Sequence, residues 1–185
     1  PHGFSEAVRE AKRIVFGAID CDKPVIAKVN GDAIGLGATV ALFCDIIFAA
    51  DTARLGDPHV KIGLVAGDGG AIIWPHMIGY ARAKHYLLTG DLVPAPEAAA
   101  MGLINFSLPA EELDAAVDEL ADEIAGKSAF TVALGKQAFY RQIDMTQGDA
   151  YDFTREVMTA NAQSTDAQEG ICAFLEKRKP GWKGR

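Results

Sequence analysis

Apolar side chains at helical spacing run through the start of the chain, and a β-branched run follows them. Within residues 5–20 the apolar positions recur every three or four residues: Ala7, Val8, Ala11, Ile14, Val15, Ala18 and Ile19. This spacing predicts an amphipathic helix, which ends where 21–24 introduce charges and a proline. Residues 25–29 are rich in valine and isoleucine and stop at Asn30-Gly31, so they predict a buried strand.

A glycine-rich segment, 31–37, comes directly after this strand. The apolar residues 38–43 predict a helix, and 45–50 predict a second buried strand. A strand, a glycine loop, a helix and a strand in this order form an α/β unit. The front of the chain is therefore expected to belong to the α/β class.

The rest of the chain is predicted to be a loop and then a series of helices. Residues 53–56 are expected to be extended, and 57–70 form a glycine-rich loop. From residue 71 onward a helical pattern continues to the end, with breaks at Gly79, 90–96, 102–109, Gly126 and 147–148. The helical period is clearest in 118–125 and 129–143. We therefore predict an α/β core over residues 1–125 and a helical region over 126–185.

Composition and charge narrow the class of protein. The chain has 185 residues, of which 49% are hydrophobic, and 25 acidic against 18 basic residues give a net charge of −7. This charge repels a polyanion, so nucleic acid is not an expected partner. The cysteines, at positions 21, 44 and 172, lie far apart and form no CxxC pair, which predicts a reduced, cytoplasmic protein. The longest apolar run, 38–50, is shorter than the roughly 20 residues of a membrane helix, and residues 1–6 lack the pattern of a signal peptide.

The glycine-rich segment 31–37 is the first candidate for chemistry. A dinucleotide-binding loop needs a third glycine where this chain has Val40, and the lysine of a phosphate-binding P-loop is missing. What remains is a turn that exposes backbone N–H groups at the start of a helix, and such groups can stabilise an oxyanion. The alternative is a tight turn between strand and helix that binds no ligand.

His59 is the second candidate, because among the histidines it alone lies in an irregular, glycine-rich segment beside carboxylates. Its ordinary titration range suits a proton carrier near neutral pH. Asp68 is expected to cap the helix that follows. The alternative is a loop histidine and a capping aspartate with no catalytic role. The four histidines have no metal-ligand spacing, so no metal site is predicted.

Two strings, KPVIAKVNGDAIGLGA and ALFCDIIFA over residues 23–49, resemble the crotonase (enoyl-CoA hydratase/isomerase) superfamily. LLTGD at 87–91, AAAMGLI at 98–104 and AFLEKR at 173–178 extend the resemblance. It implies a spiral of ββα units, a helical C-terminal region that builds trimers or dimers of trimers, and an acyl-CoA substrate of fatty acid metabolism. It also implies two backbone N–H groups that hold the enolate oxyanion of the thioester.

The resemblance assigns roles to particular residues of this chain. The second oxyanion N–H corresponds to Leu36, with Gly37 beside it, and Phe174 and Lys177 correspond to the aromatic and lysine that reach the CoA of a neighbouring subunit. Coenzyme A would be part of the substrate, and no separate cofactor is expected. For the basic tail the alternative is a solvated chain end.

The chain departs from the superfamily pattern at two positions, so the resemblance does not decide which reaction the protein would catalyse. The two glutamates of enoyl-CoA hydratases correspond here to Thr39 and His59, and threonine cannot act as a carboxylate base. The spacing of His59 and Asp68, with Trp74-Pro75-His76 after them, is similar to the branch typified by 6-oxocamphor hydrolase, in which a His and an Asp cleave a β-diketone. In that branch a further histidine corresponds to Leu36 of this chain.

The resemblance also implies an opening block of strands, with the first oxyanion N–H, that this sequence lacks. We therefore expect either part of a longer protein or a shortened relative. Three hypotheses follow: an acyl-CoA enzyme that uses a His/Asp proton-transfer pair, a crotonase-fold hydrolase that cleaves a C–C or thioester bond, and a non-catalytic assembly subunit.

Overall fold

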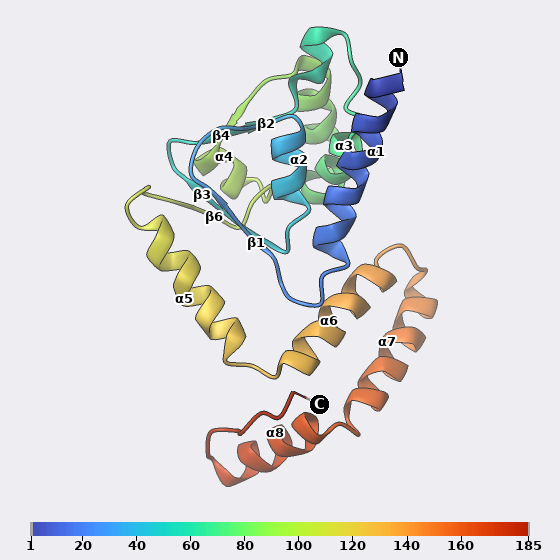
Figure 1. Ribbon diagram of the computed structural model, residues 1–185, viewed down its shortest axis with the longest axis vertical. Coiled ribbons are helices and arrows are strands. Elements are labelled where there is room, and N and C mark those ends of the chain that lie inside the picture. The colour runs from blue at the N-terminus through green and yellow to red at the C-terminus, as the bar shows by residue number, and fades with distance from the viewer. Residues whose placement is uncertain (1, 185) are drawn as a thin grey trace. The chain divides into compact units, whose positions relative to one another are not determined.

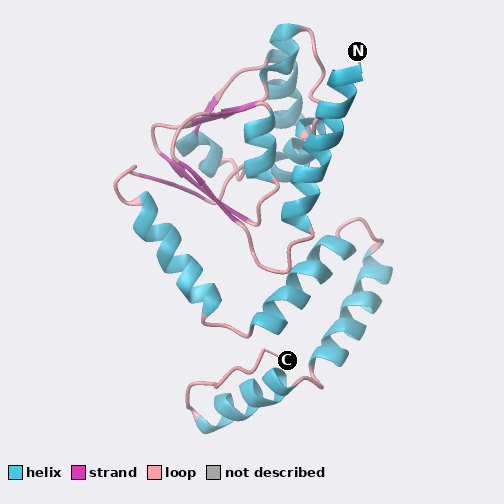
Figure 2. Cartoon of the chain, in the orientation of Figure 1, coloured by secondary structure: helices cyan, strands magenta, loops and turns pink. Residues whose placement is uncertain are grey.

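The computed structural model describes residues 2–184, which form two compact units (Figures 1 and 2). The first unit contains α1 (His2–Ile19) and the segment Val25–Glu119, and the second contains Asp20–Pro24 and the chain from Leu120 onward. The strands of the described residues all lie in the first unit, whereas the second is helical. In the described part of the chain no helix combines the length and the apolar character needed to cross a membrane.

Two three-stranded sheets organise the first unit. Their strands are β1 (Ile26–Val29), β2 (Ala33–Ile34), β3 (Ile46–Ala50), β4 (Arg54–Gly56), β5 (Val93–Pro94) and β6 (Phe106–Leu108). One sheet has the order β1-β3-β6 with parallel neighbours, and the other has the order β2-β4-β5, in which β4 is parallel to β2 and antiparallel to β5. Residues that follow β2 and β4 therefore leave the second sheet at the same edge.

Both units contain helices. They are α2 (Leu36–Leu42), α3 (Gly70–Thr89), α4 (Ala95–Ala100), α5 (Leu113–Ala125), α6 (Ala129–Gln142), α7 (Gln147–Asn161) and α8 (Thr165–Glu176), with a 3₁₀ helix, η1 (Pro58–Ile62). Helix α2 contacts α1, α3, β1 and β2, so the start of α2 is held from several sides. The predicted break at Gly79 is present, since Gly79 has φ 75° and ψ 163° within α3.

The apolar runs of the first unit form strands because their side chains are buried in its core. Ile47, Phe48, Ala49 and Ala50 of β3 are all buried, and the ring of Phe48 lies 4.6 Å from that of Phe106 on β6. Trp74 of α3 is fully buried as well. Burial on both faces accounts for a strand with an unbroken apolar run.

Three elements differ from the prediction. Strands β5 and β6 were not predicted, and they lie in the segments 90–96 and 102–109, which were predicted only as breaks between helices. β2 likewise lies within the predicted glycine turn. Each of these strands has two or three residues and forms by pairing with a strand distant in sequence, so local periodicity carries no signal for it.

Candidate active site

The loop after β4 holds His59 in a defined turn. Asp57 follows the strand directly and caps η1, because its side chain accepts a hydrogen bond from the backbone N–H of His59 at 3.5 Å. Pro58 occupies the first position of η1, where a missing N–H costs nothing. Gly63 ends η1 in the left-handed region, with φ 76°. The sequence Asp-Pro-His thus encodes a rigid short helix that carries the imidazole.

The imidazole of His59 lies between two carboxylates. Its Nδ1 hydrogen-bonds with Oδ1 of Asp57, and its Nε2 lies 3.6 Å from Oδ2 of Asp68. The side chains of His59, Asp57 and Asp68 are 20%, 1% and 11% exposed. One ring nitrogen is therefore hydrogen-bonded to a buried partner, whereas the other faces the second carboxylate at a distance longer than a hydrogen bond.

His59 and Asp68 open onto a mainly apolar cavity of about 390 Å³. Its lining residues are Val8, Ala11, Leu36, His59, Leu64, Val65, Gly67 and Asp68. The structure thus brings together three of the residues predicted from the sequence, His59, Asp68 and Leu36. Gly37 follows Leu36 in α2 but is not among the lining residues.

The turn at Gly35 directs the start of α2 toward this cavity. Gly35 has φ 57° and ψ −124°, and a Cβ at this position would lie 3.4 Å from Cε1 of His59. Leu36 is the first residue of α2, so its N–H has no partner within the helix. Among the described residues no hydrogen-bond acceptor is found for it. Leu36, the residue that carries this N–H, therefore lines the same cavity as His59.

Asp68 does not cap the helix that follows it, so this prediction is wrong. The N-cap of α3 is Gly69, with φ 125°, and no side chain caps the helix. A left-handed backbone at Gly69 turns the chain into α3 without an aspartate cap. The carboxylate of Asp68 is thereby left beside Nε2 of His59, and its Oδ1 is buried without a hydrogen-bond partner among the described residues.

Thr39 lies inside the core. It is fully buried, and its hydroxyl has no hydrogen-bond partner among the residues that the structure describes. Its methyl group packs so closely against Gly69 that a Cβ there would lie 2.7 Å from it. Thr39 is therefore placed as a packing residue.

Thr39→Val should leave catalysis unchanged. Removing a buried hydroxyl that has no partner should leave kcat/KM within about 2-fold and the free energy of unfolding equal or higher by up to about 1 kcal/mol. Steady-state kinetics and urea unfolding measure both quantities. A rate loss of about tenfold or more would show instead that the hydroxyl takes part in the reaction.

Asp57, His59 and Asp68 also form a cluster that offers metal-ligand atoms within 4.8 Å of one another. Nδ1 of His59 is already bound to Asp57, so Nε2 and the oxygens of Asp68 are what remains for an ion. Zinc sites use three or four protein ligands, which this arrangement does not reach. The geometry fits proton transfer better than metal binding.

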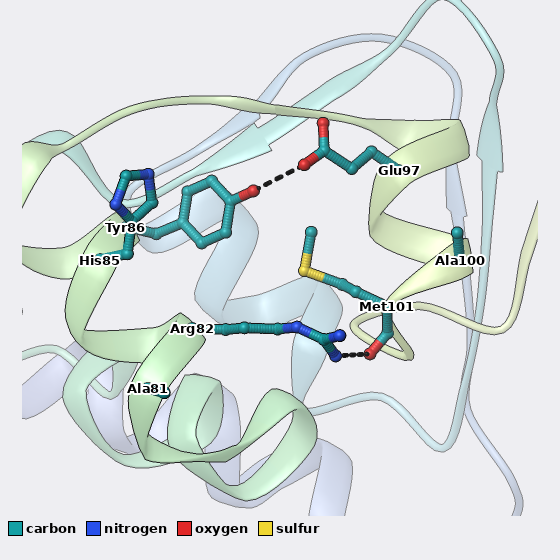
Figure 3. A pocket seen from close by; sticks show the side chains of 7 residues that line it. All are labelled: Ala81, Arg82, His85, Tyr86, Glu97, Ala100 and Met101. Atoms are coloured by element: carbon teal, nitrogen blue, oxygen red, sulfur yellow. Dashed lines mark hydrogen bonds between the residues drawn. The ribbon is translucent and has the colours of Figure 1, made fainter.

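A second cavity of the first unit lies between α3 and α4, and Figure 3 shows its lining side chains. It has a volume of about 550 Å³ and is lined by Ala81, Arg82, His85, Tyr86, Glu97, Ala100 and Met101. The hydroxyl of Tyr86 donates to Oε1 of Glu97 at 2.9 Å, and burial, followed by Glu97, raises the pKa of Tyr86. Tyr86 therefore keeps its proton at neutral pH, and no residue predicted to be catalytic lies here.

Phe174 and Lys177 lie in the second unit, on α8 and at its C-terminal end. Phe174 is 83% exposed and lines an apolar cavity of about 570 Å³ together with Trp182. Lys177 ends α8 in the left-handed region, with φ 55°. The tail beyond it folds back, since Nε1 of Trp182 donates to the carbonyl of Gly126 at 2.8 Å. The tail is therefore partly structured.

A charged pair ties this tail to α8. The guanidinium of Arg178 donates to both oxygens of Glu169, at 2.6 and 3.0 Å, and the N–H of Gly181 donates to the same carboxylate at 2.7 Å. The hydrogen bonds from Arg178, followed by that from Gly181, lower the pKa of Glu169 from 4.5 to about 2. Because the folded pKa is the lower one, this stabilisation is complete above the unfolded pKa and is lost as the pH falls from 4.5 toward 2.

Glu169→Gln should therefore lower stability at neutral pH, and the difference from the wild type should narrow in acid. Urea unfolding at about pH 7 and about pH 3.5 measures this difference, which solvent screening keeps small. Glu156→Gln, at an exposed position of α7, is the control and should show no such change between the two pH values. A difference for Glu169→Gln that stays constant with pH would contradict the charged pair.

Residues 6–185 match the family model described as enoyl-CoA hydratase/isomerase. The chain belongs to the enoyl-CoA hydratase/isomerase family. The superfamily resemblance carried by the glycine-rich strings is thereby confirmed.

The chain is similar to several named proteins and to solved structures of the family. A probable mitochondrial enoyl-CoA hydratase of Dictyostelium discoideum is 37% identical over 163 residues, covering 88% of this chain and 59% of that protein. The crotonyl-CoA hydratase of Syntrophomonas wolfei is 37% identical over 166 residues, covering 89% and 64%. A crystal structure of enoyl-CoA hydratase from Bacillus anthracis superimposes with a TM-score of 0.96 at 31% identity, covering 100% of this chain and 72% of that one.

The match over the whole chain confirms the α/β crotonase fold with parallel strands and C-terminal helices. The chain spans 59% and 64% of the lengths of the two relatives named above. The predicted roles of His59, Asp68, Leu36, Phe174 and Lys177 stay predictions after this comparison.

Sequence reasoning missed Asp57, the residue in closest contact with His59. The signal was present, since an aspartate two residues before the histidine, with proline between them, is typical of a side chain that caps a short turn. The sequence alone does not indicate that this carboxylate is buried, because its burial depends on contact with the start of α3.

Proposed function

We propose that the protein acts on an enoyl-CoA thioester and adds water across its double bond through an enolate. The observation that carries this proposal is that Leu36, His59 and Asp68 line one apolar cavity. The backbone donor suits the thioester oxygen, the apolar wall suits an acyl chain, and the imidazole suits proton transfer. The name of the crotonyl-CoA hydratase relative supports a short enoyl-CoA as the first substrate to test.

One imidazole can move both protons of this reaction. Nε2 of His59 takes a proton from water while the water oxygen bonds to C3 of the enoyl group. The C2=C3 electron pair then forms the C1=C2 bond, and the carbonyl π pair moves onto the thioester oxygen. The Leu36 N–H donates to that oxygen and stabilises the enolate. The imidazolium then returns its proton to C2 as the thioester carbonyl re-forms, so one water is added and His59 is regenerated.

The two carboxylates assist without reacting. Asp57, at Nδ1, stabilises the positive charge that the ring acquires when Nε2 takes the proton. Asp68, 3.6 Å from Nε2, would accept a hydrogen bond from a water that lies beside the two groups in the cavity, and so orient that water. This scheme replaces the two glutamates of the superfamily pattern by one histidine and its partners.

Substrate binding and assembly are a second part of the proposal. Phe174 and Lys177 would contact the CoA of a neighbouring subunit, and Lys177 carries the positive charge that attracts its phosphates. Large apolar side chains on the second unit, among them Tyr151, Met158, Phe174 and Leu175, are 72–83% exposed. Such exposure supports a homotrimer or a dimer of trimers.

Hydrolysis of a β-diketone is the second candidate reaction. The observation that favours it is the Asp57–His59 hydrogen bond, since a histidine held by a carboxylate at Nδ1 is the arrangement that activates water for attack on a carbonyl. The same Nε2 would take the proton of water, and the Leu36 N–H would receive the developing oxyanion.

Turnover of two substrates by the full-length protein tests these alternatives. Crotonyl-CoA and a cyclic β-diketone are incubated separately with the protein, and the products are identified by mass spectrometry. Formation of 3-hydroxybutyryl-CoA supports the proposal. Turnover of the diketone alone would select the second candidate, and turnover of neither would leave the assembly-subunit hypothesis.

A further inference from the structure

We propose that Asp57 is a positioning residue, which holds His59 as the Nδ1–H tautomer and so makes Nε2 the proton-accepting atom in the cavity. This inference rests on the proposed function for its meaning, but its structural content, the tautomer, can be measured without a substrate. The resemblance described above assigned no role to this position.

Burial is the first observation. The side chain of Asp57 is 1% exposed, and its ion-pair partner among the described residues is His59. Oδ2 of Asp57 is buried with no hydrogen-bond partner in the same part of the chain. Burying a carboxylate with so few partners is costly, which makes it a poor device for stability alone. An effect of the carboxylate on the imidazole of His59 explains this buried position better than a contribution to stability does.

The start of α3 supplies the second observation. A Cβ on Gly70, the first residue of α3, would lie 1.8 Å from Oδ2 of Asp57, so the carboxylate fills the space that a side chain there would need. The N-terminal end of a helix favours a negative charge, which offsets part of the cost of burial. Asp57 and Gly70 are thus a matched pair, although they are distant in sequence.

The consequence for His59 follows from hydrogen-bond chemistry. A carboxylate only accepts, so Nδ1 must be the protonated nitrogen in the neutral ring, and Nε2 then carries the lone pair. Nε2 faces Asp68 across 3.6 Å, which is too long for a hydrogen bond, so Asp68 does not hold a proton on this nitrogen. Asp57 therefore selects both the tautomer and the orientation of the ring.

Asp57→Asn tests this directly. The amide can donate to Nδ1, which would move the ring proton to Nε2 and remove the acceptor from the cavity. We expect the ¹⁵N NMR signals of the His59 ring to change from the Nδ1–H to the Nε2–H pattern, and kcat to fall by about 10²–10⁴-fold with little change in KM. Asp91→Asn, at a carboxylate that is 53% exposed, is the control and should change neither.

Gly70→Ala gives a second route that keeps Asp57 in the chain. The added methyl group displaces the carboxylate from its place, and we expect the same loss of the Nδ1–H tautomer. This variant keeps the test decisive if Asp57→Asn does not fold.

The NMR readout separates this inference from the proposed function. A tautomer change without any enoyl-CoA turnover in the wild type would support the role of Asp57 and reject the proposed reaction. A wild-type ring in the Nε2–H form, or a ring whose tautomer stays the same in both folded variants, would overturn the inference even if the enzyme hydrates crotonyl-CoA.

Discussion

Replacing His59 by glutamine should lower kcat/KM for crotonyl-CoA by about 10²–10⁴-fold, the usual range for loss of a general acid–base group. Glutamine is similar in size and polar, but its amide can neither take nor return a proton near neutral pH. The cavity and the Leu36 N–H are retained, so substrate binding should change much less than kcat. The rate of loss of the conjugated enoyl thioester absorbance measures the effect.

His76→Gln is the matched control for this change. His76 lies on α3 at an exposed position and is not among the residues that line the His59 cavity. Its replacement should leave the rate unchanged, and both variants should unfold at urea concentrations close to that of the wild type. A His59→Gln enzyme with the wild-type rate would reject His59 as the proton carrier.

Removing the Leu36 N–H should have the next largest effect. Proline is tolerated at the first position of a helix, which Leu36 occupies in α2, so Leu36→Pro deletes the backbone donor with little cost to the helix. Loss of one oxyanion donor typically lowers kcat by about 10²–10³-fold, or about 2.7–4 kcal/mol of transition-state stabilisation. Steady-state kinetics with crotonyl-CoA measure it, and circular dichroism checks the fold.

Leu36→Ala separates the backbone donor from the side chain. The alanine variant keeps the N–H but shortens a side chain that lines the cavity, so it should change KM more than kcat. Equal losses of kcat in the proline and alanine variants would mean that the side chain matters and the N–H does not.

Elements that bury an apolar face were predictable from local pattern. Helix α1 and strand β3 lie close to the predicted ranges, because periodicity and β-branched runs report burial directly. Strand β6 was missed, since Phe106–Leu108 lies within the break predicted at 102–109 and forms a strand only by pairing with Phe48–Ala50 of β3. Contacts of this kind carry little local signal.

The residues of the candidate site were predictable from the sequence, but the contacts between them were not. A loop histidine, an aspartate nine residues later and an exposed N–H at the start of a helix could each be found from motifs. The contact between Asp57 and the imidazole could not, because it depends on α3 beginning with a glycine against the carboxylate. The error on Asp68 has the same origin, since Gly69 takes over the N-cap of α3.

We propose that one imidazole and one backbone N–H together hydrate an enoyl-CoA through an enolate. The mass spectrum of the product formed from crotonyl-CoA in D₂O tests this reaction most directly. We expect 3-hydroxybutyryl-CoA with one deuterium at C2, formed by the wild type and nearly lost with His59→Gln. Absence of this product with the wild type would rule out the hydration, and its undiminished formation by His59→Gln would rule out His59 as the proton carrier.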